Sequence, residues 1–499
     1  MICITLAQES RHLLLADMLN AAAMGADMLE IRLDCLDKAP AFADIMAAKR
    51  KPLLFSCRRQ EDGGHWKGTE DERLMLLRQA IMSKADYVEI EYDVADQIRP
   101  FPGCQRVISY TNVAKMPSAI ADIYEDMLSM KPDVIKLTVR AKTPEEAWPL
   151  VQLLGKPKVP TVVVGLGRSG VMLAVLGKKI GAPWTSAALE RGMEAFPGEP
   201  TIRDLVDIYH YRDIGKPTRF VGVTGLGERE FFAAGATNAA FAHLGLPHRV
   251  LPLQVGNLKL FRKVIDIVKL QGVSMEEQFY EQVHEAASFD ESSRPPVQGA
   301  DLMLPGGDAG WIGSNSLGHW AVAALQQTLR DHDPDKEEPL RGRIVMLAGT
   351  GPLTRMIAPA LKERGAALVF ASKDRSSAQR LGQVFGGRQV AWEGIYTTTH
   401  DVLVVSRDAA SGDEEVEEGT ELPVHPGYLK SNITVMDLTS IPRSSPFLRE
   451  AKLRGCTVVP AVSLLSHQVR EQVMRIGGRD IDEAFLREKL ALWIDEENG

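Results

Sequence analysis

The chain has 499 residues, which is long enough for two to four domains that each bury a core. Its net charge of −8 and its charged fraction of 25% are typical of a mildly acidic globular protein and give no basic excess for binding nucleic acid. No apolar run reaches membrane-spanning length, and the opening MICITLAQES lacks the charged and apolar regions of a secretory signal. We therefore expect neither a membrane nor a nucleic-acid partner.

The five cysteines are scattered, and most lie inside apolar segments. The sequence has no CxxC motif and no cysteine–histidine spacing of the kind that binds metals. Reduced thiols in a cytoplasmic protein fit this pattern best, and no metal site is expected.

The first 215 residues alternate strand-like and helix-like segments. Helical patterns occur at residues 11–24, 71–83 and 144–154. Eight strands, each followed by a helix, predict an α/β fold that opens with a (β/α)8 TIM barrel over residues 1–215. The strand patterns are MICITLA, DMLEIRLD, PLLFSCR, YVEIEYD, QRVISYT, DVIKLTV, TVVVGLG and PWTSAAL.

A lysine interrupts the sixth of these strands. In PDVIKLTVRA, Lys136 lies on the same face as Val134 and Thr138. A buried ammonium tends to lose its proton, and the neutral amine is a nucleophile that condenses with ketones. The alternative is a structural lysine that extends to the strand end or pairs with a carboxylate.

Charged side chains also alternate with apolar ones on the second to fourth strands. Because barrel sites are built at the C-terminal ends of strands, this alternation predicts a polar pocket there. A structural network of ion pairs would give the same pattern. The residues concerned are Glu30, Arg32, Asp34, Arg58, Glu89, Glu91 and Asp93.

The strings LEIRLD, LLFSCRRQEDGG, VEIEYD, VISYTN and DVIKLTV, in this order, resemble the type I 3-dehydroquinate dehydratases over residues 1–212. The resemblance implies that Lys136 forms a Schiff base with the substrate ketone, while a histidine moves the proton of the neighbouring carbon. It also implies substrate-binding roles for Glu30, Arg32 and Arg58. Asp62 stands where a glutamate is usual in that family.

Three positions depart from the family's pattern. Thr111 stands at the histidine of the catalytic S-x-H-[DN] string, and a hydroxyl cannot act as a base in the way that an imidazole does. Ala174 replaces the arginine that binds the substrate carboxylate, and Arg168 is the candidate substitute. In the final loop, Glu199 stands where a glutamine is usual. These replacements predict an impaired or altered dehydratase activity.

Residues 219–490 resemble the shikimate dehydrogenases, which plants and some bacteria carry fused behind this dehydratase. The resemblance implies a substrate-binding domain over residues 219–338, a Rossmann-type NADP-binding domain over residues 339–463, and helices over residues 464–497 that pack back on the former. The strings that carry it are FVGVTG, SNSLGHWAVAAL and DLTSIPRSSPFLREAKLRGCTVVPAVSLLSHQ.

Most of the substrate-site residues of that second family are replaced. Tyr280 stands at the catalytic lysine and Leu317 at its partner aspartate, whereas Asn315 and Gln468 are retained. The family's reaction needs the lysine–aspartate pair to position and protonate the hydroxyl or ketone. We therefore expect no shikimate dehydrogenation by the family's route.

A glycine turn marks the expected nucleotide site. In LAGTGPLTRMIA, Gly349 and Gly351 lie between a strand and a helix, where glycines let the backbone approach a pyrophosphate. A tight turn without a ligand would look the same. The resemblance puts Lys373 at the arginine that binds the 2′-phosphate, with Arg375 nearby, which favours NADP over NAD. A solvated loop is the alternative for these two cations.

Three interpretations of the whole chain are open. The favoured one is a fused shikimate-pathway enzyme: a lyase that dehydrates 3-dehydroquinate to 3-dehydroshikimate through Lys136, joined to an NADP-dependent dehydrogenase-like half. The alternatives are a degenerate regulator that binds a metabolite or nucleotide, and a Schiff-base lyase with a different substrate. The expected ligand is a small cyclitol carboxylate, and the sequence leaves a homodimer open.

Overall fold

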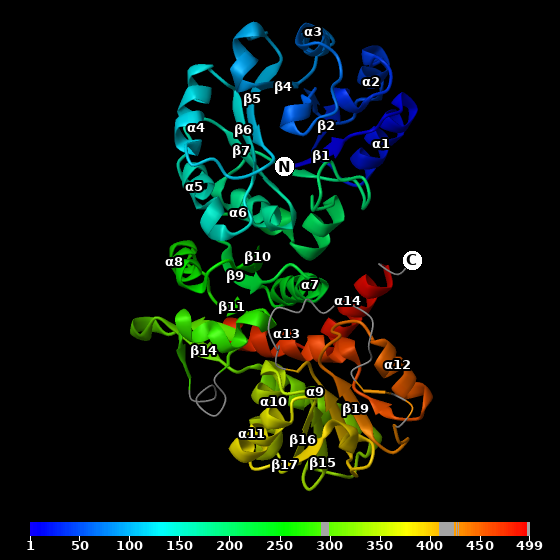
Figure 1. Ribbon diagram of the computed structural model, residues 1–499. Coiled ribbons are helices and arrows are strands. Elements are labelled where there is room, and N and C mark those ends of the chain that lie inside the picture. The colour runs from blue at the N-terminus through cyan, green and yellow to red at the C-terminus, as the bar shows by residue number, and fades with distance from the viewer. Residues whose placement is uncertain (291–298, 409–423, 426, 428, 497–499) are drawn as a thin grey trace. The chain divides into compact units, whose positions relative to one another are not determined.

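The computed structural model describes residues 1–290, 299–408, 424–425, 427 and 429–496 (Figure 1). The chain divides into two compact units. One unit comprises Met1–Thr218 and Leu251–Ile267, and the other comprises Arg219–Val250 and Val268–Gly499. Of the helices within the described ranges, none is long and apolar enough to cross a membrane.

Eight parallel strands form the sheet of the first unit. They are β1 (Ile2–Leu6), β2 (Met28–Arg32), β3 (Leu53–Ser56), β4 (Tyr87–Glu91), β5 (Gln105–Asn112), β6 (Val134–Arg140), β7 (Thr161–Leu166) and β8 (Thr185–Ala187). Their order in the sheet is β7-β6-β5-β4-β3-β2-β1-β8. The two end strands, β7 and β8, lie next to each other, so the sheet curls into a barrel. The predicted barrel fold is confirmed.

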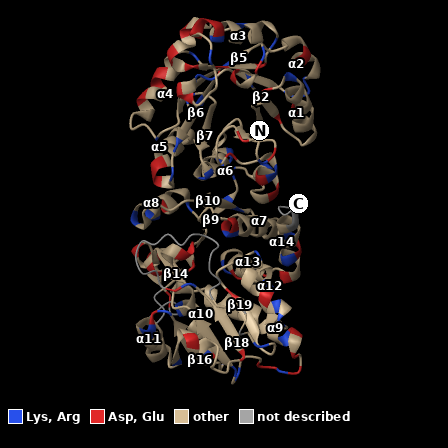
Figure 2. Ribbon diagram, turned by 45° about the vertical axis from the view of Figure 1, so that its right-hand side comes forward, with Lys and Arg blue, Asp and Glu red and all other residues tan. Residues whose placement is uncertain are grey.

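Helices surround this sheet, and many of the charged side chains of the first unit lie on them (Figure 2). They are α1 (Arg11–Ala23), α2 (Phe42–Ala48), α3 (Glu70–Met82), α4 (Ile120–Ser129), α5 (Pro144–Gly155) and α6 (Val171–Ile180). The expectation of a helix after every strand is wrong at β4, which is followed by the 3₁₀ segment η3 (Tyr92–Gln97). Pro100 and Pro102 come directly after it, and neither can continue a helix.

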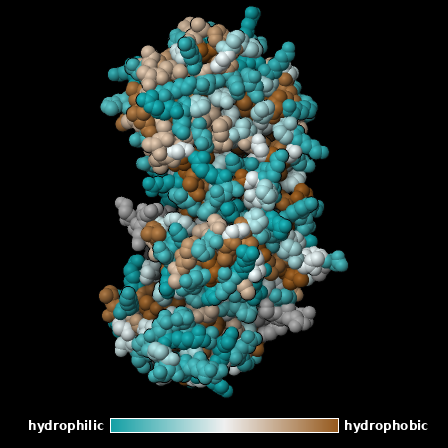
Figure 3. Space-filling view, turned by 180° about the vertical axis from the view of Figure 1, so that it is seen from behind, coloured by the Kyte–Doolittle hydropathy of each residue, from teal (hydrophilic) through white to brown (hydrophobic). Residues whose placement is uncertain are grey.

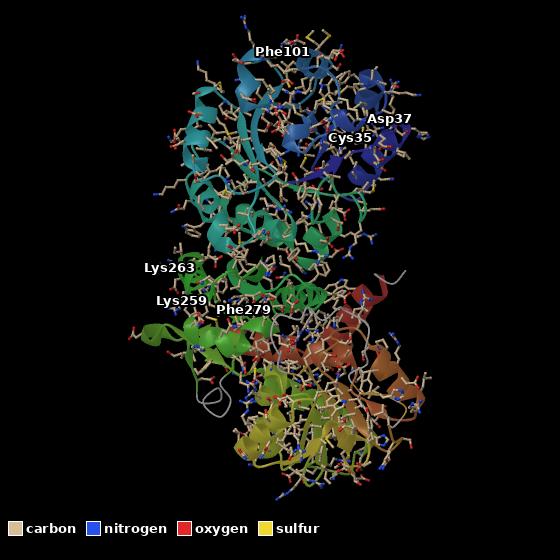
Figure 4. All side chains as sticks on the ribbon, viewed as in Figure 1. Cys35, Asp37, Phe101, Lys259, Lys263 and Phe279 are labelled. Atoms are coloured by element: carbon tan, nitrogen blue, oxygen red, sulfur yellow. The ribbon has the colours of Figure 1, made fainter. Side chains whose placement is uncertain are left out.

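Four strands, β2, β3, β4 and β8, end two residues earlier than their sequence patterns predict. The ladder between β2 and β3 stops at the pair Arg32 and Ser56. Asp34 therefore lies in the 3₁₀ turn η1 (Leu33–Cys35), and Arg58 lies beyond β3. Cys35 and Asp37, labelled in Figure 4, mark this turn and the loop after it.

The barrel interior is apolar at one level and charged at the next. The apolar cluster contains Cys3, Met28, Leu54, Val107, Val134, Val162 and Trp184, and Val164 extends it one level further along β7. Side chains two residues further along a strand point to the same side. The next level toward the C-terminal ends of the strands therefore holds Thr5, Glu30, Ser56 and Lys136.

The second unit contains two six-stranded sheets. One has the order β10-β9-β11-β13-β14-β12 and the other the order β17-β16-β15-β18-β19-β20. The latter is parallel and has the strand order of a Rossmann fold, which confirms the predicted fold class. The strands are β9 (Arg219–Thr224), β10 (His248–Leu253), β11 (Val273–Ser274), β12 (Ser288–Phe289), β13 (Leu302–Pro305), β14 (Trp311–Ser314), β15 (Ile344–Ala348), β16 (Ala367–Ser372), β17 (Arg388–Ala391), β18 (Val402–Val405), β19 (Thr434–Asp437) and β20 (Thr457–Val458).

The C-terminal helices of the chain pack against an early helix of this unit. Leu465, Val469, Leu486 and Leu490 share one hydrophobic cluster with Phe232 of α7 (Glu228–His243). The predicted helical tail is two helices, α13 (Ala461–Gly477) and α14 (Glu483–Glu496). The other helices of this unit are α9 (Leu317–His332), α10 (Pro352–Glu363), α11 (Arg375–Phe385) and α12 (Pro446–Leu453), whereas α8 (Leu258–Val268) belongs to the first unit up to Ile267. Hydrophilic side chains cover much of the face seen in Figure 3.

We predict that Thr69→Ala lowers the free energy of unfolding by about 1 kcal/mol, because it removes a helix cap. The Thr69 hydroxyl accepts a hydrogen bond from the Glu72 N–H at the start of α3, and the Glu72 carboxylate accepts one from the Thr69 N–H. Urea denaturation measures the change. Thr69→Ser keeps the hydroxyl and serves as the control. An equal loss of stability in Thr69→Ala and Thr69→Ser would contradict the role of the Thr69 hydroxyl as a helix cap.

Candidate functional site

The side chain of Lys136 is fully buried inside the barrel. Its Nζ lies 2.9 Å from Glu30 Oε2 and 2.7 Å from Glu89 Oε2. The lysine therefore does not extend to solvent. Two carboxylates offset the cost of removing its ammonium from water, and either one can accept its proton.

Arg58 completes this cluster of charges. Its Nη2 lies 2.9 Å from Glu30 Oε1, and its Nε lies 3.8 Å from Glu89 Oε1. The Ser56 hydroxyl donates a further hydrogen bond to Glu30 Oε1 at 2.8 Å. Burial alone would raise the pKa of Glu30, but the Lys136 and Arg58 cations hold that pKa well below its usual range. Glu30 is thus ionised at neutral pH.

Two further predicted binding residues of the barrel, Arg32 and Asp62, form ion pairs with partners outside this cluster. Arg32 forms a two-point ion pair with Asp34, at 3.0 Å from Nε to Oδ1 and 2.7 Å from Nη2 to Oδ2. Asp62 forms its ion pair with Arg59, at 2.7 Å. Burial raises the pKa of Asp62. Within the described residues, the ion pair of Asp62 is with Arg59 and not with a member of the Lys136 cluster.

Thr111, at the position of the family's histidine, and Arg168, the candidate substitute for its arginine, differ in their exposure to solvent. Thr111 of β5 is half-buried and pairs with Thr138 of β6, two residues beyond the pair Ser109 and Lys136. It therefore lies on the face of Lys136. Arg168 is exposed in the 3₁₀ turn η4 (Arg168–Gly170) and forms no ion pair in the part of the chain that the structure describes.

Glu199 is brought to the mouth of the barrel and is only 4% exposed. Its Oε2 accepts a hydrogen bond from the Ala195 N–H at 2.8 Å, and its Oε1 accepts one from the Thr5 hydroxyl at 3.4 Å. Burial raises the pKa of Glu199 to about 7, against the opposing effect of the Ala195 N–H, and the Glu30 charge adds to the rise. This carboxyl group therefore changes its protonation state near neutral pH.

The motifs did not single out Glu89 as a site residue, although the strand pattern placed it on the correct face. Glu89 is 4% exposed and contacts both Lys136 and Arg58. The available signal was the register of parallel neighbours, because β4 and β6 flank β5. Side chains at one level of such strands converge inside a barrel.

Comparison with known proteins places this geometry in a family. The model of type I 3-dehydroquinase matches residues 2–216. A 3-dehydroquinate dehydratase of Methanopyrus kandleri is 31% identical over 191 residues, which cover 37% of this chain and 87% of that protein. The chain belongs to the type I 3-dehydroquinase family. Residues 2–216 are therefore called the dehydroquinase barrel.

The similarity extends beyond the dehydroquinase barrel. A chloroplastic bifunctional 3-dehydroquinate dehydratase/shikimate dehydrogenase of Arabidopsis thaliana is 26% identical over 490 residues, covering 95% of this chain and 81% of that protein. A shikimate dehydrogenase solved in complex with NADP+ matches 56% of this chain and 96% of its own, at a TM-score of 0.47 and 18% identity. The chain is thus related to bifunctional proteins along nearly all of its length.

In the second unit, the predicted substrate residues are occupied by partners of their own. The Asn315 Nδ2 donates to the Met356 carbonyl at 2.8 Å, and the Gln468 Oε1 accepts from Arg229 Nη2 at 2.9 Å. Tyr280 is 1% exposed, and burial raises its pKa. The motifs gave no sign of Arg229, whose guanidinium also lies over the Trp320 ring at 5.8 Å from its centre.

The glycine turn of the Rossmann sheet is already in contact with an anion from the chain itself. The Thr350 N–H and hydroxyl each donate to Asp408 Oδ1 at 3.2 Å, and the Ser372 hydroxyl donates to it at 2.6 Å. The Gly351 N–H donates to the Arg407 carbonyl at 3.0 Å. Thr350 and Ser372 therefore supply the contacts to the Asp408 carboxylate near the start of α10, whereas the Gly349 N–H donates to the Ala371 carbonyl at 2.9 Å.

The cations expected to select NADP lie after β16. Lys373 and Arg375 are exposed there, on either side of Asp374, which caps α11 through the Ser376 N–H. Their role in binding a 2′-phosphate stays a prediction. Among the described residues, no group of three or more histidine, cysteine, aspartate or glutamate side chains is arranged to hold a metal ion.

We predict that Glu199→Gln stabilises the protein more at pH 8 than at pH 4. A pKa raised by folding means that the ionised form is disfavoured in the folded state, so the cost is absent below the unfolded pKa near 4.5 and complete above about 7. The expected difference between the two pH values is about 3 kcal/mol. Urea denaturation at both pH values measures it, and the exposed Glu190→Gln is the control. A gain that does not depend on pH would contradict the assignment.

Proposed function

We propose that the dehydroquinase barrel dehydrates 3-dehydroquinate to 3-dehydroshikimate through a Schiff base on Lys136. The observation that carries this proposal is the buried Lys136 amine between two carboxylates that can accept its proton. An interior ammonium with no chemical role would be a poor choice for stability, because well-packed apolar residues often do as well. The substrate would be a cyclitol carboxylate that carries a ketone.

The chemistry begins with a proton leaving Lys136. Glu30 Oε2 or Glu89 Oε2 takes it, and the neutral amine attacks the ketone carbon. Loss of water from the adduct leaves an iminium, whose positive charge makes the neighbouring C–H acidic. After the substrate hydroxyl has left, water hydrolyses the iminium, releases the product and restores the lysine.

The cations of the pocket would orient the substrate. Arg58 and Arg32 lie beside the lysine cluster, and a substrate carboxylate would meet them first. A Schiff-base lyase with a different substrate is the second candidate, because Arg168 is exposed and Ala174 is buried in α6. The family's pattern implies an arginine that binds the substrate carboxylate. With Ala174 at that position and Arg168 exposed, this contact would be weaker.

For the second unit we propose a substrate-binding domain over residues 219–338 and an NADP-binding domain over residues 339–463. Gly349, Thr350 and Gly351 would hold the pyrophosphate, and Lys373 and Arg375 the 2′-phosphate, once Asp408 has left the turn. NADP supplies hydride chemistry when bound. Tyr280 and Leu317 offer no lysine–aspartate pair, so no hydride transfer to shikimate is assigned to this unit.

The first test is borohydride trapping with 3-dehydroquinate, read by intact mass and peptide mapping. We expect one substrate-sized adduct on Lys136, because borohydride reduces the iminium to a stable amine. Lys136→Met should give no adduct. A ligand with an alcohol in place of the ketone is the second control, since it cannot condense with the amine. An adduct on another lysine, or none at saturating ligand, would refute the proposal.

We predict that Asp408→Asn binds NADPH at least about 10-fold more tightly than the unchanged protein, because a charge that competes with the phosphates is removed. Fluorescence titration of NADPH measures the affinity. Lys373→Ala in the same background should weaken the binding of NADPH and leave that of NADH unaltered. If Asp408→Asn binds NADPH no more tightly than the unchanged protein does, the Asp408 carboxylate does not compete with the phosphates for this turn.

A further inference from the structure

We propose that Glu199 is the catalytic acid–base of the barrel: it removes the proton from the carbon next to the iminium and then delivers it to the departing hydroxyl. This inference rests on the proposed Schiff-base dehydration and names the group that replaces the histidine absent at Thr111. It also gives a role to an acidic residue that stands where the family usually has a glutamine.

The loop that carries Glu199 is built to turn its side chain inward. Gly198 adopts a positive φ of +82°, and a Cβ at this residue would lie 2.4 Å from the Arg168 N. Only glycine permits this approach to the end of β7 without strain. The next residue, Glu199, is thereby directed into the barrel mouth, where the Ala195 N–H and the Thr5 hydroxyl fix its two oxygens.

The strand register sets how far this carboxylate is from the reacting amine. Thr5 of β1 is the register partner of Glu30 of β2, and neighbouring strands are roughly 4.8 Å apart. Glu30 in turn lies 2.9 Å from Lys136 Nζ. Glu199 is therefore held next to the strand pair that carries Glu30, near enough for the charges of Glu30 and Lys136 to act on it. A six-membered ring bound to the lysine could extend toward this carboxylate.

The other acidic groups at this level are not suited to the task. Glu30 and Glu89 are each bound to Lys136 and Arg58, and Asp34 is bound to Arg32. Glu30 and Glu89 face the amine itself and exchange its proton, so another group is needed at the carbon next to the iminium. Glu199, by contrast, forms no ion pair within the described residues, and its buried carboxyl has a pKa of about 7. A proton-transfer group works best when its pKa lies near the working pH.

The step balances without any further reactant. The Glu199 carboxylate takes the proton, the C–H electron pair moves into the ring, and the iminium becomes an enamine. The enamine electrons then expel the hydroxyl on the next carbon, which leaves as water with the proton from Glu199. The iminium forms again, now conjugated with the new double bond, and the carboxylate is restored. The net change is the loss of one water.

The test compares Glu199→Gln with the unchanged protein in two assays on the full chain. Glutamine matches glutamate in shape, so we expect the borohydride adduct on Lys136 to form as before. Dehydration of 3-dehydroquinate should fall at least about 100-fold, as on removal of a positioned base. The unchanged protein should also show a rate that rises through pH 7, and Glu199→Gln should lack this rise.

A second variant separates lost chemistry from lost shape. Adding Thr111→His to Glu199→Gln supplies an imidazole at the position of the family's histidine, and we expect it to restore turnover. Dehydration by Glu199→Gln at the original rate would overturn the role of Glu199, and so would loss of the adduct together with turnover. No adduct in the unchanged protein would refute the Schiff-base proposal itself. An adduct without turnover there would refute only the role of Glu199.

Discussion

The ammonium of Lys136 lies where no water reaches it, within 2.9 Å of one carboxylate and 2.7 Å of another. An isolated charge in such a place would cost several kcal/mol, and removal of one partner of a buried pair typically costs about 3–5 kcal/mol. The arrangement holds only as a unit: Glu30 needs Lys136 and Arg58, and Arg58 needs Glu30 and Glu89. Every other assignment in the barrel refers to this set of charges, because it fixes where a ketone can react and which neighbouring acids are already committed.

Much of this could be predicted from the sequence. Period-2 patterns placed the eight barrel strands, and they put Lys136 and Glu30 on the inner face. The pairing of charges could not be predicted, because it depends on register between strands that are far apart in the chain. Thr5 and Glu199 are separated by 194 residues, yet they share a hydrogen bond. The turn η1 was missed for a simpler reason, since the apolar–polar alternation continues to Asp34 after the ladder has stopped.

In the second unit, the residues that support the fold differ from those of the predicted site. The Rossmann strand order depends on buried apolar strands, and residues such as Val345, Phe370 and Val404 still supply them. The polar positions obey no such constraint. Asn315 and Gln468 match the resemblance in type, but each is hydrogen-bonded within the chain. The Arg229 contact with Gln468 could not be read from motifs, because the two residues lie 239 positions apart and no local pattern links them.

The apolar residues on the N-terminal side of Lys136 affect how a small molecule could enter and leave the barrel. Cys3, Leu54, Val107, Val134 and Trp184 close the interior on the side of the N-terminal strand ends. If the proposed dehydration takes place at Lys136, the ketone would enter and its product would leave at the opposite end of the barrel, where the strands end and Glu199 lies. Bound product would then lie in the path of the next substrate molecule, so product inhibition is the consequence expected of this apolar layer.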